Sequence, residues 1–332
     1  MNKDDKMTKK CKAVEGNLEK PKHWSEHREK AGRWQMVLFF LFIKILPAFL
    51  LSLAAYPVGF CYFLFSKKAR TESRRFGARF GARHFSALKH ITAFALTVVE
   101  KTQAWSGKIP FKRIHFMDDD IAALIAQLEQ GKGAVLLCSH LGNTELLRAL
   151  SDFRRTGVAR DIPVTSVLDV ETTHFFGRLL FELNPRSALK IINARNIDPG
   201  SVIALQEETE KGGLAVIAGD RTSAQNRNNV FTLPFLGADA PFPRGPFLLA
   251  ALLEAPVYAV FALRKKDLSP VPDYNFHVHL LGQNEKEVSR RNRNSMMENW
   301  ARQFSALLEG YLLDHPYQWY NFYDFWAQDV KE

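Results

Sequence analysis

One stretch decides how this chain is expected to fold: Ala134-Val135-Leu136-Leu137-Cys138-Ser139-His140-Leu141-Gly142-Asn143-Thr144-Glu145. An apolar run of strand length ends at Ser139, and Gly142 and Asn143 suit a tight turn and a helix N-cap. We therefore predict a strand, a turn and a helix. This geometry places His140 at the carboxyl end of a strand, the edge where open α/β sheets bind ligands.

The first turn of the predicted helix carries Glu145, which could fold back onto the imidazole of His140. A carboxylate on one ring nitrogen fixes the tautomer and leaves the other nitrogen free to take a proton from a hydroxyl. The pair would supply two members of a serine-protease arrangement, with a substrate hydroxyl as the third. The alternative is that Asn143 and Glu145 only cap the helix, because such pairs also arise by chance.

Length, composition and charge set the outer limits of the prediction. The chain has 332 residues, 46% of them hydrophobic, which allows a large core in two domains or in one α/β domain with additions. Its net charge of +10 indicates an anionic partner, which could be nucleic acid, a membrane surface or an acidic carrier. Cys11, Cys61 and Cys138 form no disulfide or zinc pattern and fit a reducing compartment.

The N-terminal part of the chain has the composition of a membrane attachment. Residues 1–33 are polar and rich in lysine, and we expect them to be disordered. Residues 34–66 are almost uncharged and exceed the ~20 residues that a spanning helix needs. Both flanks are basic, which favours a re-entrant or in-plane anchor over a single span with asymmetric charge. The alternative is a pair of helices buried in the protein core.

Residues 67–110 follow this apolar segment as a predicted basic connector. The run Arg75-Phe76-Gly77-Ala78-Arg79-Phe80-Gly81-Ala82-Arg83 alternates arginines with aromatic and small residues. We predict one amphipathic helix over residues 70–105. Arginines with interleaved aromatics can bind nucleic acid, but beside a membrane segment anionic lipid headgroups are the better partner.

From residue 111 to residue 332, predicted strands and helices alternate. The strands are expected at residues 134–139, 162–168, 189–193, 214–218, 257–263 and 274–281. The helices are expected at residues 121–130, 173–183, 199–211, 247–254 and 288–313. Alternation of this kind predicts one α/β domain with a single, mostly parallel mixed sheet flanked by helices.

A second charged cluster, Gly219-Asp220-Arg221, follows the strand predicted at residues 214–218. If the sheet is parallel there, the cluster lies at the same edge as His140. Arg221 could then bind phosphate oxygens, with Asp220 holding it in place, or the two could form only a loop salt bridge. The proline-rich apolar loop at residues 230–247 could wall an apolar pocket, and its Arg244 is either a contact for an anionic substrate or a surface residue.

Two further features concern the last third of the chain. His277 and His279 share one face of a predicted strand, most simply its polar face. Residues 316–326 are too aromatic for a solvated terminus, so we expect them to dock on the domain or on the membrane interface. The sequence has no glycine-rich nucleotide-binding fingerprint and no nucleophile elbow.

Taken together, these blocks resemble a known family. Ser139 to Glu145 resembles the His-x4-Asp/Glu block of the lysophospholipid acyltransferase superfamily. Gly219 to Arg221, Val230 to Gly237 and Pro246 to Val260 look like later blocks of its lipid A late-acyltransferase branch. His315 to Trp319 is similar to that branch's His-Pro-x-Gln tail. The resemblance extends from about Trp24 to Trp326.

The resemblance implies a glycerol-phosphate-acyltransferase-like sheet and transfer of a fatty acyl group. The donor would be a thioester on acyl carrier protein or coenzyme A, and the acceptor a hydroxyl of a membrane lipid. The reaction would take place at the cytoplasmic face of a bacterial inner membrane, without metal or bound cofactor. By position, His140 is the general base, Glu145 its orienting carboxylate, and Arg221 a phosphate-binding residue supported by Asp220.

Three points remain open at this level. Asn143 and Arg244 are further candidates for substrate binding, and backbone N–H groups near Gly142 are candidate donors to an oxyanion. The aromatic tail looks more like a bacterial predicted-acyltransferase subgroup, which in some bacteria occurs among aryl-polyene or related fatty-acid pathway enzymes. The acceptor could therefore be lipid A, an aryl-polyene lipid or an ornithine-type lipid. A catalytically inactive membrane scaffold is the remaining alternative.

Overall fold

The computed structural model describes residues 45–81, 84–105, 107–117, 120–150, 158, 160–169, 189–221, 228–284 and 290–326. The predicted polar segment at residues 1–33, the start of the apolar segment at residues 34–44 and the helix predicted at residues 173–183 lie outside this range.

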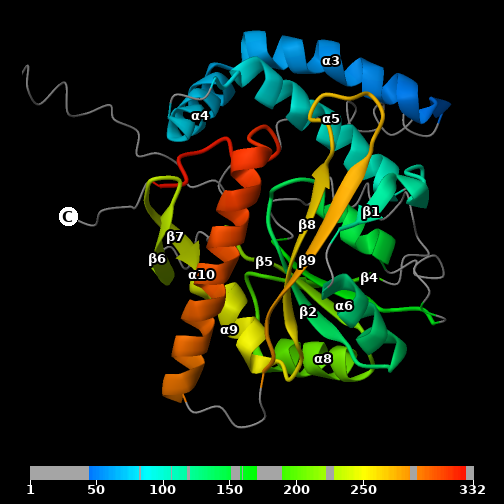
Figure 1. The fold of residues 1–332 in the computed structure, drawn as a ribbon, viewed down its shortest axis with the longest axis vertical. Coiled ribbons are helices and arrows are strands. Elements are labelled where there is room, and N and C mark those ends of the chain that lie inside the picture. The colour runs from blue at the N-terminus through cyan, green and yellow to red at the C-terminus, as the bar shows by residue number, and fades with distance from the viewer. Residues whose placement is uncertain are drawn as a thin grey trace, which may run out of the picture.

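A seven-stranded sheet forms the centre of the molecule, with the strand order β1-β9-β8-β2-β5-β3-β4 (Figure 1). All neighbouring strands run parallel except β8 and β9. This confirms the predicted mixed α/β fold with a mostly parallel sheet. In the order of the sheet, the strands are β1 (Ile114–Phe116), β9 (Tyr274–Gly282), β8 (Val257–Arg264), β2 (Ala134–Cys138), β5 (Leu214–Ala218), β3 (Val164–Leu168) and β4 (Leu189–Asn193).

The central strands β2 and β5 pair in parallel from Ala134 and Leu214 to Cys138 and Ala218. Their side chains alternate between two hydrophobic cores, so that Val135 contributes to one core and Leu136 to the other. Because both faces are covered, both strands are apolar along their whole length. Their carboxyl ends lie side by side, as predicted for the segments that carry His140 and Asp220.

Helices cover both faces of the sheet. The core on one face includes residues of α8 (Pro199–Glu210), α9 (Arg244–Leu252) and α10 (Arg290–Asp314). The core on the other face includes residues of α6 (Asp120–Glu129). Asp198 caps α8 by accepting a hydrogen bond from the Ser201 backbone at 2.7 Å. The 3-10 helix η4 (Phe111–Arg113) leads into β1.

The apolar loop predicted at residues 230–247 is instead an antiparallel hairpin of β6 (Val230–Phe235) and β7 (Ala238–Pro243). Its turn is Leu236-Gly237, and both residues have positive φ values, 49° and 76°. Two-residue turns with positive φ match the twist of hairpin strands, which explains why these proline-rich segments still pair. The hairpin buries Phe235 and Phe242 beside Phe325 of the C-terminal tail.

The single helix predicted at residues 70–105 is broken. The chain forms α4 (Lys67–Gly77), the 3-10 helix η3 (Ala78–Phe80) and α5 (Ala87–Trp105), with Gly81 at a φ of 63° between them. Glycine adopts this left-handed conformation without the steric cost that other residues pay, so the chain turns here. The polar helix α4 and the longer helix α5 therefore act as separate elements.

The apolar helix α3 (Ala48–Phe65) lies along α5 at one end of the molecule (Figure 1). Within the described ranges it is the helix long and apolar enough to cross a membrane. Its buried positions are Leu51, Ser52, Ala55 and Gly59. Large hydrophobic side chains are exposed over the rest of its surface, at Phe49, Leu50, Leu53, Val58, Phe60, Tyr62, Leu64 and Phe65.

Candidate active site

His140 follows β2 in a turn that only glycine can complete. Gly142 has a φ of 74°, and a Cβ atom there would lie 2.1 Å from the carbonyl oxygen of Ala262. The backbone N–H of Asn143 then donates to the same carbonyl oxygen of Ala262 at 2.9 Å. Its side-chain oxygen accepts from the backbone N–H of Glu145 at 3.2 Å, which is the predicted capping contact. The helix that follows, η5 (Thr144–Leu150), is a 3-10 helix and not an α-helix.

The imidazole of His140 is held by Asp220, which follows the neighbouring strand β5. Nδ1 of His140 lies 2.8 Å from Oδ1 of Asp220, and the backbone N–H of His140 donates to Oδ2 at 2.8 Å. An ionised carboxylate only accepts hydrogen bonds, so Nδ1 carries the proton and Nε2 of the neutral ring has a free lone pair. The Asp220 side chain is fully buried, whereas 32% of the His140 side chain is accessible.

This geometry changes the role predicted for Glu145. The carboxylate on Nδ1 is Asp220, 80 residues away in the chain, and not Glu145. The parallel register of β2 and β5 brings Asp220 there, whereas we predicted that Asp220 would only support Arg221. Glu145 is half-buried, and its charge contributes with Asp220 to a raised pKa of the buried Cys138 thiol, after the larger effect of burial. Its contribution to the chemistry remains a prediction.

The electrostatics favour a charged Asp220 and a neutral His140. Burial acts to raise the pKa of Asp220, but the charge and hydrogen bond of His140, with Arg221 and Trp319, outweigh it and lower that pKa to about 2. Burial lowers the pKa of His140, and the positive charges of Arg221 and Lys101 lower it further. The charge and hydrogen bond of Asp220 act in the opposite direction. The imidazole is therefore a neutral base near pH 7. Lys101, on α5, was not predicted as part of the site.

Arg221 is fixed by the C-terminal tail. Its Nε and Nη2 donate to the side-chain oxygen of Asn321 at 3.0 and 2.7 Å, and Nη2 also donates to the Tyr320 carbonyl at 3.2 Å. The guanidinium carbon lies 5.8 Å from the ring centroid of Tyr323. The positive charge thus has a defined position beside the dyad of His140 and Asp220. Binding of phosphate by Arg221 remains a prediction.

The C-terminal tail docks on the domain, which is one of the two predicted alternatives; the other was the membrane interface. Trp319 is fully buried, and its indole Nε1 donates to Oδ2 of Asp220 at 3.0 Å. The backbone carbonyl of Gln318 accepts the N–H of Gly142 at 2.9 Å. Because the tail already holds this N–H, and Ala262 holds that of Asn143, these amides are not available as the predicted oxyanion donors.

A buried polar chain supports the loop of His140 from the other side. The side-chain amide of Asn143 lies 3.4 Å from the Tyr274 hydroxyl, which donates to Glu100. Glu100 pairs with Arg264 at 3.1 Å, and both side chains are almost inaccessible. Asn143 is itself fully buried, so this geometry favours a positioning role for it over contact with substrate. Nothing in the local sequence around Glu100 or Arg264 indicated this pairing.

The other predicted residues lie apart from this cluster. Arg244 begins α9, and its guanidinium stacks over Phe231 with a distance of 4.3 Å to the ring centroid. His277 and His279 lie half-buried on one face of β9, where both rings contact Tyr311.

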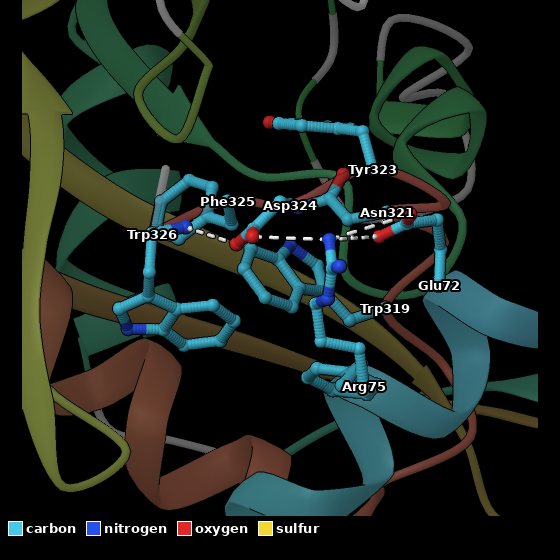
Figure 2. Close-up of a pocket in the computed structure, with 9 residues that line it drawn as sticks. Glu72, Arg75, Trp319, Asn321, Tyr323, Asp324, Phe325 and Trp326 are labelled. Carbon is cyan, nitrogen blue, oxygen red and sulfur yellow. Dashed lines mark hydrogen bonds and ion pairs between the residues drawn. The ribbon is translucent and has the colours of Figure 1, made fainter. Parts of the chain in front are cut away.

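A shallow pocket lies between α4 and the tail, with about 220 Å³ of empty space that includes open solvent. Figure 2 shows Arg75 at its mouth, between the carboxylates of Glu72 and Asp324. Trp319 forms part of the wall, but His140 does not, so this pocket is separate from the accessible edge of the imidazole. The lining residues are Glu72, Arg75, Phe76, Trp319, Asn321, Tyr323, Asp324, Phe325 and Trp326.

Comparison with known proteins gives one result that spans most of the chain. A family model described as bacterial lipid A biosynthesis acyltransferase matches residues 19–327. The match includes α3, the segment of His140, the segment of Asp220 and the aromatic tail. No curated protein matches the chain.

Proposed function

Because the chain belongs to the bacterial lipid A biosynthesis acyltransferase family, we propose that it moves a fatty acyl chain from a carrier thioester to a hydroxyl of a membrane glycolipid. The family implies an acyltransferase that acts on a lipid. The proposal adds the carrier thioester, the hydroxyl acceptor and the residues that perform the transfer. The observation that carries it is the hydrogen bond from Nδ1 of His140 to the buried Asp220, which leaves Nε2 free.

The transfer follows from that tautomer. Nε2 of His140 takes the proton of the acceptor hydroxyl as its oxygen attacks the thioester carbonyl carbon. Asp220 keeps the ring oriented and stabilises the imidazolium that forms. When the tetrahedral intermediate collapses, the carbon–sulfur bond breaks and the leaving thiolate takes the proton from Nε2. An ester and a free thiol result, and His140 is neutral again.

Positive charge near the dyad supports the same reaction. Arg221 and Lys101 both act on His140 electrostatically. We assign to these cations the stabilisation of the oxyanion or the binding of a phosphate of the donor or acceptor, which are both electrostatic roles. The overall charge of +10 would attract an acidic acyl carrier protein, which affects the rate of encounter more than the chemistry.

We further propose that α3 lies in the plane of the inner membrane, with the active site on the cytoplasmic side. One side of α3 packs against α5, and the other exposes large apolar side chains. Its 18 residues correspond to roughly 27 Å at 1.5 Å per residue, slightly less than the ~30 Å hydrocarbon core. Lys67 and Lys68 are exposed at the start of the next helix, α4, and Arg74 is exposed in its last turn, where they would meet anionic headgroups.

The test is mass spectrometry of envelope lipids from cells that make the wild-type protein, the His140→Ala variant or neither. We expect a lipid heavier by one acyl chain in the wild type and its loss in His140→Ala. His115→Ala is a matched control, because His115 also pairs with a carboxylate, Asp273, at 2.7 Å, but outside the site. Wild-type product levels in His140→Ala would contradict the proposed mechanism.

The same measurement separates the possible acceptors. A shift in lipid A would place the chain with the main reaction of its family. A shift in an aryl-polyene or ornithine-type lipid would fit the resemblance of the aromatic tail to another acyltransferase subgroup. Well-expressed, folded protein without any shifted lipid would favour the inactive membrane scaffold.

A further inference from the structure

We propose that Trp319, in the C-terminal tail, is a positioning residue of the active site that sets the orientation and basicity of Asp220. This inference rests on the proposed role of His140 as the base. The tail is far from both residues in the chain, and only the fold brings its indole to the dyad.

The hydrogen bonds of Asp220 carry the first step of the argument. Its carboxylate is fully buried and accepts from the Nδ1 of His140, the backbone N–H of His140 and the indole N–H of Trp319, at 2.8, 2.8 and 3.0 Å. Two of these donors belong to the histidine that must change its protonation state. Trp319 is the donor from outside the dyad, so it holds the carboxylate in place while His140 gains and loses a proton.

Trp319 is itself fixed by contacts of its ring, its backbone and its carbonyl oxygen. Its ring packs against Phe76, Phe235 and Phe325, with centroid distances of 5.4, 5.5 and 4.9 Å. The backbone of Trp319 pairs with that of Leu141, the residue after His140. Its carbonyl accepts from Nε2 of the buried His90 at 3.0 Å. A donor that is fixed by this many contacts loses little conformational entropy when it binds the carboxylate.

The consequence for His140 follows from charge. The indole N–H draws negative charge from Asp220, which weakens the stabilisation that the carboxylate gives to the imidazolium. The other groups that act on His140 are the cations Arg221 and Lys101, and Glu145 faces Cys138 nearby. Removing only the indole N–H should therefore raise the pKa of His140, while the loosened carboxylate slows the reaction.

A sulfur isostere of tryptophan tests this in the full-length protein. β-(3-Benzothienyl)alanine at position 319 keeps the shape of the ring but has no N–H. We expect kcat to fall roughly tenfold to a hundredfold, as for other hydrogen bonds to charged groups. NMR titration of 13C-labelled histidine, with the His140 signal assigned from His140→Ala, should show its pKa displaced upward.

Trp300 provides the matched control, since it is a buried tryptophan of α10 in the same core. The isostere at position 300 should leave kcat and the His140 titration unchanged. Unchanged kcat and titration with the isostere at position 319 would overturn the proposal. If the wild type proves inactive on every lipid but the His140 titration still moves, the positioning role stands and the proposed function fails.

Discussion

Two buried carboxylates, Asp220 and Glu100, have similar surroundings and very different consequences. Each is fully buried, each pairs with a basic side chain, and each accepts a hydrogen bond from a large aromatic side chain, Trp319 or Tyr274. The pKa of Asp220 is lowered to about 2, mainly because His140 outweighs burial. Burial raises the pKa of Glu100 to about 7, although Arg264 and Tyr274 oppose it.

The difference lies in the basic partner of each carboxylate and in the accessibility of that partner. Arg264 is 1% accessible and cannot release its proton, so the Glu100 pair can only hold the elements together. His140 is 32% accessible, and its imidazole can take up and release a proton, which a guanidinium cannot do. A buried carboxylate and its basic partner become a candidate for catalysis when the partner can exchange a proton and is accessible at the surface. The following substitutions test this difference between the pair of Asp220 and the pair of Glu100.

The largest effect is expected from Asp220→Asn. An amide cannot accept from the His140 and Trp319 donors as the carboxylate does, so the imidazole loses its fixed tautomer. In a comparable triad the same change lowers kcat about 10⁴-fold, and we expect a loss of that order in an acyl-transfer assay. Glu145→Gln is the parallel measurement on the carboxylate predicted from sequence. If Glu145→Gln lost this much kcat and Asp220→Asn remained active, Glu145 and not Asp220 would be the carboxylate that orients His140.

The second change breaks the other pair. Arg264→Met leaves Glu100 buried without its cation, which should lower the free energy of unfolding by about 3–5 kcal/mol. Denaturant titration measures this loss, and the double variant Glu100→Leu with Arg264→Met should recover most of it. The folded fraction should keep far more activity than Asp220→Asn. Inactive but fully stable Arg264→Met protein would show that this pair also belongs to the chemistry.

The smallest effect concerns the charge of Lys101. Its positive charge lowers the pKa of His140, so Lys101→Met should raise that pKa and protonate more of the base at low pH. In the pH profile of kcat/KM, the acidic limb should move to higher pH by about half a unit, which is roughly threefold in rate on that limb. Lys132→Met, exposed before the start of β2, is the control and should leave the limb in place. A limb displaced to lower pH would contradict the assigned direction.

Much of the site's framework could be predicted because it is local. The apolar run before His140, the turn at Gly142 and the cluster at Asp220 each show in a few consecutive residues. A parallel sheet then requires the two strand ends to meet at one edge. The aromatic composition of residues 316–326 likewise predicted that the tail docks on the domain or on the membrane interface, because exposed tryptophans are unfavourable in water.

The partners within the site depended on tertiary contacts that no local pattern encodes. Glu145 is five residues from His140, but the register of β2 and β5 gave the Nδ1 position to Asp220. Trp319 was predicted only as part of a docking aromatic tail, and nothing in the sequence singled out Glu100. The break at Gly81 was missed because the flanking arginine and aromatic pattern continues across it. Local spacing therefore predicted the position of His140 at the end of β2 but not the residues that hold its ring.

The position of the tail along the chain also has a consequence for biosynthesis. During translation, α3 leaves the ribosome long before residues 318–321, which supply the contacts to Gly142, Asp220 and Arg221. If α3 attaches to the membrane as proposed, a nascent chain reaches the membrane while His140 and Asp220 still lack the contacts of the tail. Catalytic competence would then begin only after that segment has been released, so that incomplete chains at the membrane would bind lipid without modifying it.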